Sequence, residues 1–245
     1  MKVYVFHKPT YPRTLLQGRP ISSVGRVGLD GAACKGIPVK DHGRESAAWD
    51  SILQIDLPEQ ARLFLDMLAQ KIKKEIERVN ALEVAEIGCG RGELIRRLAR
   101  SLPHCRFVGY DLSASMISRL NSAALPNEEF ECLSLPQVTD RSFDCVLCIN
   151  TLHYVPESLL SIKRLWKTVR PGGLFIFNYP NRYYAAMLPA KPQSELWKAV
   201  EEPMRKRINL LSQKQIREAL LGARMRHLHS SGRHNVFLVF EKARA

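Results

Sequence analysis

The feature that most constrains the fold is a strand-like run that meets a glycine-rich turn and then a helix, "LEVAEIGCGRGELIRRLAR", residues 82–100. The first half has the continuous apolar character of a buried strand, and the second half has the apolar spacing of an amphipathic helix. Gly88, Gly90 and Gly92 stand between them, where bare backbone can turn sharply and approach a ligand closely. Because Glu86 comes just before this turn, the ligand must suit a carboxylate.

Strands and helices alternate along the rest of the chain. Short, nearly continuous apolar strands separated by helices are typical of a mostly parallel sheet that is covered on both faces, so we expect an α/β, Rossmann-like, doubly wound fold. The predicted strands are residues 81–88, 106–113, 129–135, 143–150, 174–179, 224–230 and 234–242. The predicted helices are residues 58–80, 92–102, 113–123, 157–169 and 212–223, with Ser113 as the N-cap of the third and a turn at "RPGG" after the fourth.

Two segments fall outside this alternation. Residues 1–56 carry scattered prolines and glycines with a basic excess and no sustained period, so we expect an arm or lid rather than a second domain. Residues 57–245 are then the main domain, with a lid over the substrate at about residues 179–212. That lid contains the basic run Arg205, Lys206 and Arg207, which could bind a phosphate or carboxylate or simply form a solvated helix face.

Bulk properties exclude some classes of function and leave others open. No apolar run is long enough for a membrane helix, and the cysteines do not resemble a disulfide framework, so we expect a cytoplasmic protein without a membrane span. Cys145 and Cys148 lie within one predicted strand and should point to opposite faces, which argues against zinc or redox chemistry. The net charge of +13 favours an anionic partner, although a merely solvated basic surface is the alternative.

The spacing of the turn separates two kinds of nucleotide ligand. Dinucleotide-binding turns have G-x-G-x-x-G, and the following helix receives a pyrophosphate. Here the third glycine comes one residue early, in "GCGRG", and Glu86 precedes it. A carboxylate is unfavourable beside a diphosphate but favourable beside an ammonium group. The turn therefore indicates a cationic ligand.

The pattern acid-x-G-x-G-x-G resembles the first motif of the class I S-adenosylmethionine-dependent methyltransferases. The resemblance continues in "VGYDLSASMI", "RSFDCVLCINTLHYV" and "LWKTVRPGGLFIF", and in the ending "LLGARMRHL…NVFLVFEK", all in the family's order. It implies a sheet of seven strands, mostly parallel, with an antiparallel closing strand. It also implies S-adenosyl-L-methionine as the cofactor and methyl transfer as the reaction.

The same resemblance implies roles for individual residues. Glu86 would bind the amino group of the cofactor, and Asp111 would accept the two ribose hydroxyls. The turn would lie against the methionine and ribose portion of the cofactor. Leu112 would pack on the adenine, unless it is an ordinary core leucine. The full predicted cofactor set is Glu86, Gly88, Cys89, Gly90, Gly92, Asp111, Leu112, Glu131, Cys132 and Asn150.

The match to the family's pattern is looser at Glu131 and Cys132, and Asn150 has two possible roles. Glu131 and Cys132 stand where the family often has an Asp and a small residue near the adenine amine, so their match to the pattern is looser. Asn150, at the end of the fourth predicted strand, would line the methionine pocket or cap the local structure.

The acceptor is less constrained than the cofactor. His153 is the candidate general base, because an ordinary histidine titrates near neutral pH; packing beside the cofactor or helix capping is the alternative. The Asn/Asp-Pro-Pro-Tyr/Phe motif of exocyclic-amine methyltransferases is absent after the fourth strand, which counts against adenine and amide acceptors. No metal-ligand cluster is recognisable, so we expect no metal. The tyrosines that could line an acceptor cavity, or serve as ordinary core or rim residues, are Tyr154, Tyr179, Tyr183 and Tyr184.

Three functions remain open from the sequence. The favoured one is methyl transfer to an oxygen or nitrogen of a small molecule, which the basic charge would suit if the acceptor is anionic. The second is an RNA methyltransferase whose positive surface follows a phosphate backbone. The third is a non-catalytic subunit that keeps the fold as a binding platform. The sequence does not define the oligomeric state.

Overall fold

The computed structural model describes residues 51, 59–135, 137–155, 157–183, 210–233 and 235–244. The predicted N-terminal arm, apart from Ser51, lies outside these ranges together with most of the predicted lid, including Tyr184 and Arg205 to Arg207. The division of the chain into arm, domain and lid therefore stays a prediction. Within the described ranges, no helix combines the length with the apolar composition that crossing a bilayer requires.

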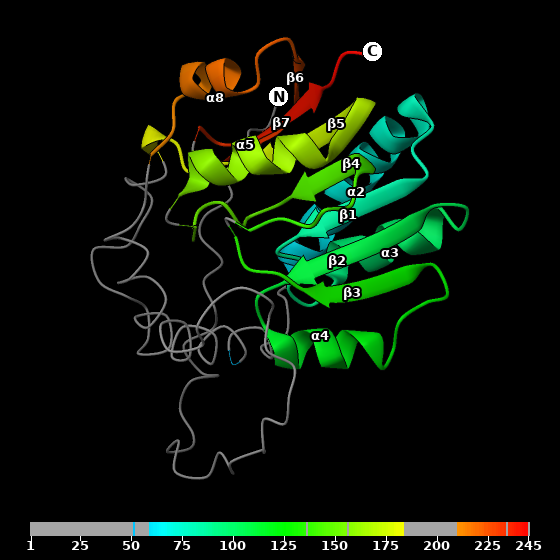
Figure 1. Ribbon diagram of the computed structural model, residues 1–245. Coiled ribbons are helices and arrows are strands. Elements are labelled where there is room, and N and C mark those ends of the chain that lie inside the picture. The colour runs from blue at the N-terminus through cyan, green and yellow to red at the C-terminus, as the bar shows by residue number, and fades with distance from the viewer. Residues whose placement is uncertain are drawn as a thin grey trace, which may run out of the picture.

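The described residues form one sheet with helices on both faces (Figure 1), which confirms the predicted fold class. The strands are β1 (Glu83–Ile87), β2 (Arg106–Asp111), β3 (Glu128–Cys132), β4 (Phe143–Cys148), β5 (Val169–Asn178), β6 (Arg224–Ser231) and β7 (Asn235–Glu241). The helices are α2 (Glu59–Val79), α3 (Glu93–Ser101), α4 (Ala114–Asn121), α5 (Ser158–Thr168) and α8 (Gln213–Ala219).

The strand order places the carboxyl ends of the central strands at one edge. The seven-stranded order is β3-β2-β1-β4-β5-β7-β6, which Figure 1 shows from β6 at the top to β3 near the bottom. β1 pairs in parallel with β2 and with β4, while β7 is antiparallel to both β5 and β6. The strand order reverses at β1, because β2 lies on one side of it and β4 on the other. Doubly wound sheets bind ligands at such a switch point.

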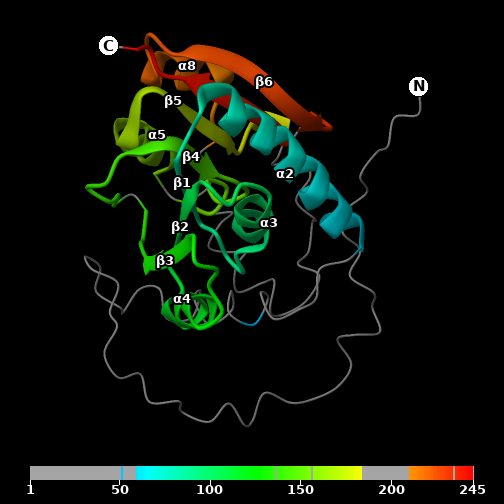
Figure 2. The ribbon, with the colours of Figure 1, turned by 90° about the vertical axis from the view of Figure 1, so that its right-hand side faces the viewer.

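Two apolar cores, one on each face, hold the sheet between its helices. One core packs α2, α3 and α4 against one face, and the other packs α5 and α8 against the opposite face (Figure 2). β4 contributes Cys145 to the first core and Cys148 to the second, and both thiols are free and buried. The predicted alternation of these cysteines is confirmed, and burial raises the pKa of each.

The helix starts follow the predicted capping chemistry. The Ser113 hydroxyl accepts the backbone N–H of Met116 at 3.1 Å, so the predicted N-cap of α4 is confirmed. α8 begins with a reciprocal capping box, in which Ser212 and Gln215 each bond the other's backbone N–H.

The predicted "RPGG" turn lies inside a strand rather than before it. β5 already begins at Val169, which pairs with Phe143, yet the next paired positions are Leu174 and Cys145. Residues 170–173 therefore bulge out of the ladder, with Gly172 at φ 76°. A bulge of this kind keeps the turn chemistry of Pro and Gly while the strand continues on both sides.

Asp144 anchors the start of three strands next to this bulge. Its Oδ2 accepts the backbone N–H groups of Leu82 and Glu83, each at 2.9 Å, and its Oδ1 accepts the Arg170 guanidinium at 3.0 Å. Burial by itself would raise the pKa of Asp144, but these donors lower it overall. The carboxylate thus joins β1, β4 and β5 at the edge opposite the glycine turn.

Asp144→Ala is expected to lower the free energy of unfolding by about 1–3 kcal/mol, because it leaves partly buried donors without their acceptor. The contribution of Asp144 should be present above about pH 4 and disappear as pH falls through its lowered pKa. Urea denaturation at pH 7 and at pH 3 measures both effects. The exposed Asp140 is the matched control, and equal losses from Asp140→Ala and Asp144→Ala would contradict the anchoring role.

Candidate active site

The glycine turn bends the chain at the carboxyl end of β1. The carbonyl oxygen of Tyr110, in β2, accepts the backbone N–H groups of Gly88 at 2.7 Å and Cys89 at 3.0 Å. Gly88, Gly90 and Gly92 have φ values of 73°, 52° and 69°, which are left-handed conformations that residues with a Cβ rarely adopt. The turn therefore depends on glycine at these positions.

Thr151 is packed against the turn, and no sequence motif pointed to this contact. A Cβ at Gly88 would lie 2.1 Å from the Thr151 Oγ1 atom and 2.4 Å from its Cγ2 atom. The Thr151 hydroxyl can donate to one of three nearby carbonyl oxygens, those of Ile149 at 3.1 Å, Ile87 at 3.2 Å and Gly88 at 3.4 Å. The loop after β4 is thereby held directly over the end of β1.

Glu86 lies beneath the turn with a carboxyl group that is only partly satisfied. The residue is 4% exposed, and the backbone N–H of Ile95, in α3, is a hydrogen-bond donor to its carboxyl group. Among the described residues, its Oε2 atom has no hydrogen-bond partner. Burial raises the pKa of Glu86 to about 8, with a further contribution from the nearby charge of Asp111.

Asp111 connects the end of β2 to the turn. Its Oδ2 accepts the backbone N–H of Gly90 at 2.8 Å, and its Oδ1 accepts that of Ser113 at 3.0 Å. An ionised carboxylate offers about four acceptor positions, so each oxygen can accept more than one donor. Burial is the main reason why the pKa values of Glu86 and Cys89 are raised, and the nearby charge of Asp111 raises both further.

Three further predicted cofactor residues are Cys89, in the glycine turn, and Leu112 and Cys132, at the ends of β2 and β3. Cys89 is buried and free, and burial raises the pKa of its thiol. Leu112 is half-buried, and its carbonyl oxygen lies 3.6 Å from the Cys132 Sγ atom. Leu112 and Cys132 are therefore neighbours at the carboxyl ends of β2 and β3, and their roles beside the adenine stay predictions.

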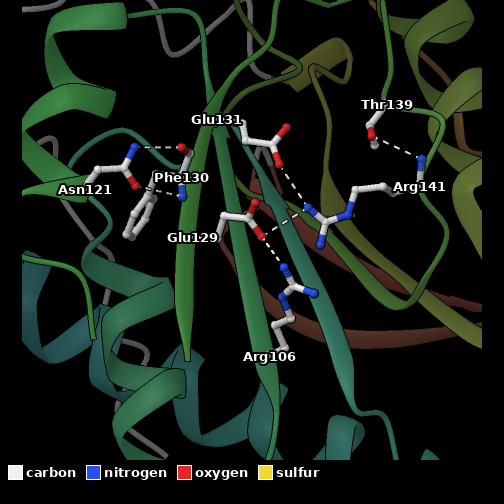
Figure 3. Close-up of polar contacts among 7 residues, drawn as sticks. All are labelled: Arg106, Asn121, Glu129, Phe130, Glu131, Thr139 and Arg141. Atoms are coloured by element: carbon white, nitrogen blue, oxygen red, sulfur yellow. Dashed lines mark hydrogen bonds and ion pairs between the residues drawn. The ribbon is translucent and has the colours of Figure 1, made fainter. Parts of the chain in front are cut away.

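Glu131 has protein partners that the sequence analysis did not predict. Its Oε1 atom accepts Arg141 Nη1 at 2.9 Å, and the same nitrogen lies 3.2 Å from Glu129 Oε2, which also accepts Arg106 at 2.7 Å (Figure 3). Burial and the neighbouring Glu129 raise the pKa of Glu131 despite Arg141. A cofactor role for Glu131 stays a prediction, and its carboxylate already forms this ion pair.

A chain of asparagines fixes the loop after β4. Asn150 has a left-handed φ of 55°, and its backbone N–H donates to Asn178 Oδ1 at 2.7 Å. The fully buried Asn178 amide in turn donates to Asn150 Oδ1 at 2.6 Å and to Asn235 Oδ1 at 2.7 Å. These bonds give Asn150 the structural role that was its alternative assignment, and its contact with a ligand stays a prediction.

The candidate base and the described tyrosines lie around the same loop and the end of β5. His153 is buried, and its ring centroid is 6.5 Å from that of Tyr154. Tyr179 is buried against Phe177, and burial raises its pKa, whereas Tyr183 is half-buried. Within the described ranges, no group of three or more histidine, cysteine, aspartate or glutamate side chains is arranged to hold a metal ion.

The structure brings most of the predicted site together at one edge. Tyr110, Asp111 and Thr151 each contact the glycine turn, so the ends of β1, β2 and β4 converge there with the buried Glu86 below. This arrangement offers a ligand a partly unsatisfied carboxylate, a bare backbone surface and a second carboxylate. Such a set suits a cationic ligand that also carries hydroxyl groups.

Comparison with known proteins agrees with this chemistry. Residues 85–175 match the family model described as "Methyltransferase domain". The trans-aconitate 2-methyltransferase of Deinococcus radiodurans is 33% identical over 98 residues, which are 40% of this chain and 38% of that protein. The fatty-acid O-methyltransferase of Mycolicibacterium smegmatis is 31% identical over 103 residues, 40% of this chain and 37% of that protein. The chain thus spans well under half the length of these curated relatives.

A solved structure shares the fold over a larger part of the chain. The plantazolicin methyltransferase BpumL, solved in complex with SAH, matches with a TM-score of 0.57. The match covers 84% of this chain and 98% of that one at 13% identity. It extends well beyond the segment that matches the family model.

Gly88→Ala is expected to lower the free energy of unfolding by more than about 2 kcal/mol, because it adds a clash with Thr151 to the cost of a left-handed alanine. Gly222→Ala is the matched control, since Gly222 has φ 79° but a Cβ there meets nothing within 4 Å. Thermal and urea unfolding of both variants measures the difference. Equal losses in the two variants would show that the Thr151 contact has no role.

Proposed function

We propose that the chain is a class I methyltransferase that transfers a methyl group from S-adenosylmethionine to a small molecule, which the match of residues 85–175 to the methyltransferase-domain model and the strand order of the sheet support. The observation that carries this proposal is Glu86, a buried carboxyl group with an unsatisfied oxygen beneath a turn of left-handed glycines.

Glu86 fits the amino end of this cofactor. A buried carboxyl group that lacks a partner is costly, and an ammonium group placed against Oε2 would supply both a donor and the opposite charge. A diphosphate in the same position would add negative charge beside Glu86 and Asp111. The electrostatics therefore support S-adenosylmethionine over a dinucleotide.

The turn and Asp111 fit the nucleoside part. The absence of side chains at Gly88, Gly90 and Gly92 lets a ligand lie directly against the backbone. The bond from the Gly90 N–H holds Asp111 at the end of β2, where its carboxylate can accept hydrogen bonds from the two ribose hydroxyls. We assign Leu112 and Cys132 to the adenine side, which their position at the ends of β2 and β3 supports.

When bound, the cofactor supplies a sulfonium-activated methyl group, so the residues of the chain mainly align the acceptor with it. Asn150 and Thr151 fix the loop that follows β4, and this loop also carries His153. We propose that His153 removes the proton from the acceptor oxygen or nitrogen, since it is the buried histidine of that loop.

The names of the relatives support a small organic acceptor. Trans-aconitate and fatty acids, named for two of them, are small molecules that carry carboxyl groups. An acceptor of this class would agree with the net charge of +13. We therefore propose an anionic small molecule as the acceptor.

Glu86→Gln is expected to weaken S-adenosylhomocysteine binding by about tenfold or more, because it removes a charge-assisted bond to the ammonium group. Since the pKa of Glu86 is about 8 without ligand, binding below that pH should release about one proton in the wild type and none in the variant. Calorimetry at pH 6.5 in two buffers of different ionisation enthalpy measures both quantities.

The pH dependence of stability gives an independent readout for Glu86. The raised pKa means that the folded protein binds more protons than the unfolded chain between pH 4.5 and about 8, so the unfolding free energy should fall as pH rises through this range. Glu86→Gln should remove that slope, whereas Glu59→Gln, at an exposed position, should keep it. Tight S-adenosylhomocysteine binding by Glu86→Gln would refute the assignment of Glu86.

His153→Ala is expected to leave S-adenosylhomocysteine affinity unchanged and to lower turnover by about 100-fold or more, as loss of a general base would. Transfer of labelled methyl from S-adenosylmethionine to a metabolite extract measures the rate, and thermal unfolding verifies that the buried site tolerates the change. His104→Ala, at an exposed position, is the control. An unchanged rate in His153→Ala would remove His153 from the catalytic residues.

A further inference from the structure

Hydrogen bonds connect the end of β5 and the residues that follow it to the turn between β6 and β7, beside the proposed site. The Asn181 amide donates to the carbonyl oxygen of Arg233 at 3.0 Å, and its Oδ1 accepts the backbone N–H of Tyr183 at 2.9 Å. Asn178, which also bonds Asn150, donates to Asn235 at 2.7 Å. Two segments about fifty residues apart in sequence are thereby held at the edge where β4 ends.

Two arginines from these segments gather on one aromatic ring. The Arg182 Cζ atom lies 4.7 Å from the centroid of the Tyr183 ring, and the Arg233 Cζ atom lies 5.9 Å from it. Arg182 Nη2 also donates to the Tyr183 hydroxyl oxygen at 2.6 Å. This bond and the charge of Arg182 lower the pKa of the phenol.

These arginines differ from eight others around the sheet in having no acidic partner among the described residues. Within the described ranges, neither Arg182 nor Arg233 forms an ion pair. The arginines that do are Arg78, Arg91, Arg96, Arg97, Arg106, Arg141, Arg170 and Arg226. Two like charges on one ring repel each other, and an anion between them would relieve the repulsion and accept several N–H donors.

We propose that Arg182 and Arg233 form a binding site for the anionic group of the acceptor, a carboxylate or a phosphate. Guanidinium groups match both groups in geometry, and Tyr183 keeps the two arginines oriented before the ligand arrives. The bonds from Asn178 to Asn150 and Asn235 place this site at the same sheet edge as the loop that carries His153. The role of the anion as a methyl acceptor rests on the proposed function, but its binding does not.

Equilibrium dialysis of the full chain with labelled succinate and, separately, labelled inorganic phosphate tests the site. Each experiment is run with and without saturating S-adenosylhomocysteine, so that both sites are measured on the same protein. The variants are Arg182→Gln, Arg233→Gln and the double variant. Arg100→Gln is the control, because Arg100 is exposed near the end of α3, at the opposite edge of the sheet, and its loss changes the net charge equally.

The wild type and Arg100→Gln are expected to bind one anion per chain, and each single variant should bind it about tenfold more weakly. Saturation by succinate but not phosphate would assign a carboxylate acceptor, and the reverse would assign a phosphate. Equal binding by the wild type and the double variant, equal losses in Arg100→Gln, or no saturable binding would each overturn the proposal. Retained anion binding in a protein that fails to bind S-adenosylhomocysteine would instead refute the proposed function alone.

Discussion

The site depends on one bifurcated backbone contact, in which the Tyr110 carbonyl oxygen accepts the N–H groups of both Gly88 and Cys89. This contact draws the end of β1 onto the end of β2, and the chain can reach it only by entering left-handed conformations. Its geometry brings Asp111 within reach of Gly90 and leaves Glu86 beneath the bend. The two carboxylates are therefore positioned by the backbone before any ligand is present.

The burial of Glu86 costs stability, which the proposed binding of a cationic ligand would offset. A carboxyl group at Glu86 is buried near Asp111 without a cationic partner among the described residues, and a fold selected for stability alone would not place it there. Asp144, at the opposite edge, has the reverse character, because three donors surround it and lower its pKa. Comparable acidic groups thus lie in opposite environments at the two edges of the sheet, and under the proposed function one edge serves binding and the other assembly.

The helices, the strands and the sheet edge that carries the glycine turn could be predicted from the sequence because they depend on local signals. Strand alternation assigned Cys145 and Cys148 to opposite faces, and the glycine spacing marked the turn. The contact of Thr151 with Gly88 and the hydrogen bonds of Asn178 join residues far apart in sequence, so no periodicity or local motif predicts them. The bulge at residues 170–173 was missed for a similar reason, since register depends on the neighbouring strand.

The position of β7 has a consequence for how the chain assembles. β7 lies between β5 and β6, and β6 pairs with no other strand of the described sheet. During synthesis, β6 therefore emerges before β7, the strand that connects it to the rest of the sheet. It has no strand to pair with until residues 235–241 follow. β7 pairs with β5 on one side and with β6 on the other, so the last strand of the sheet to be translated is also the one that connects β6 to the rest.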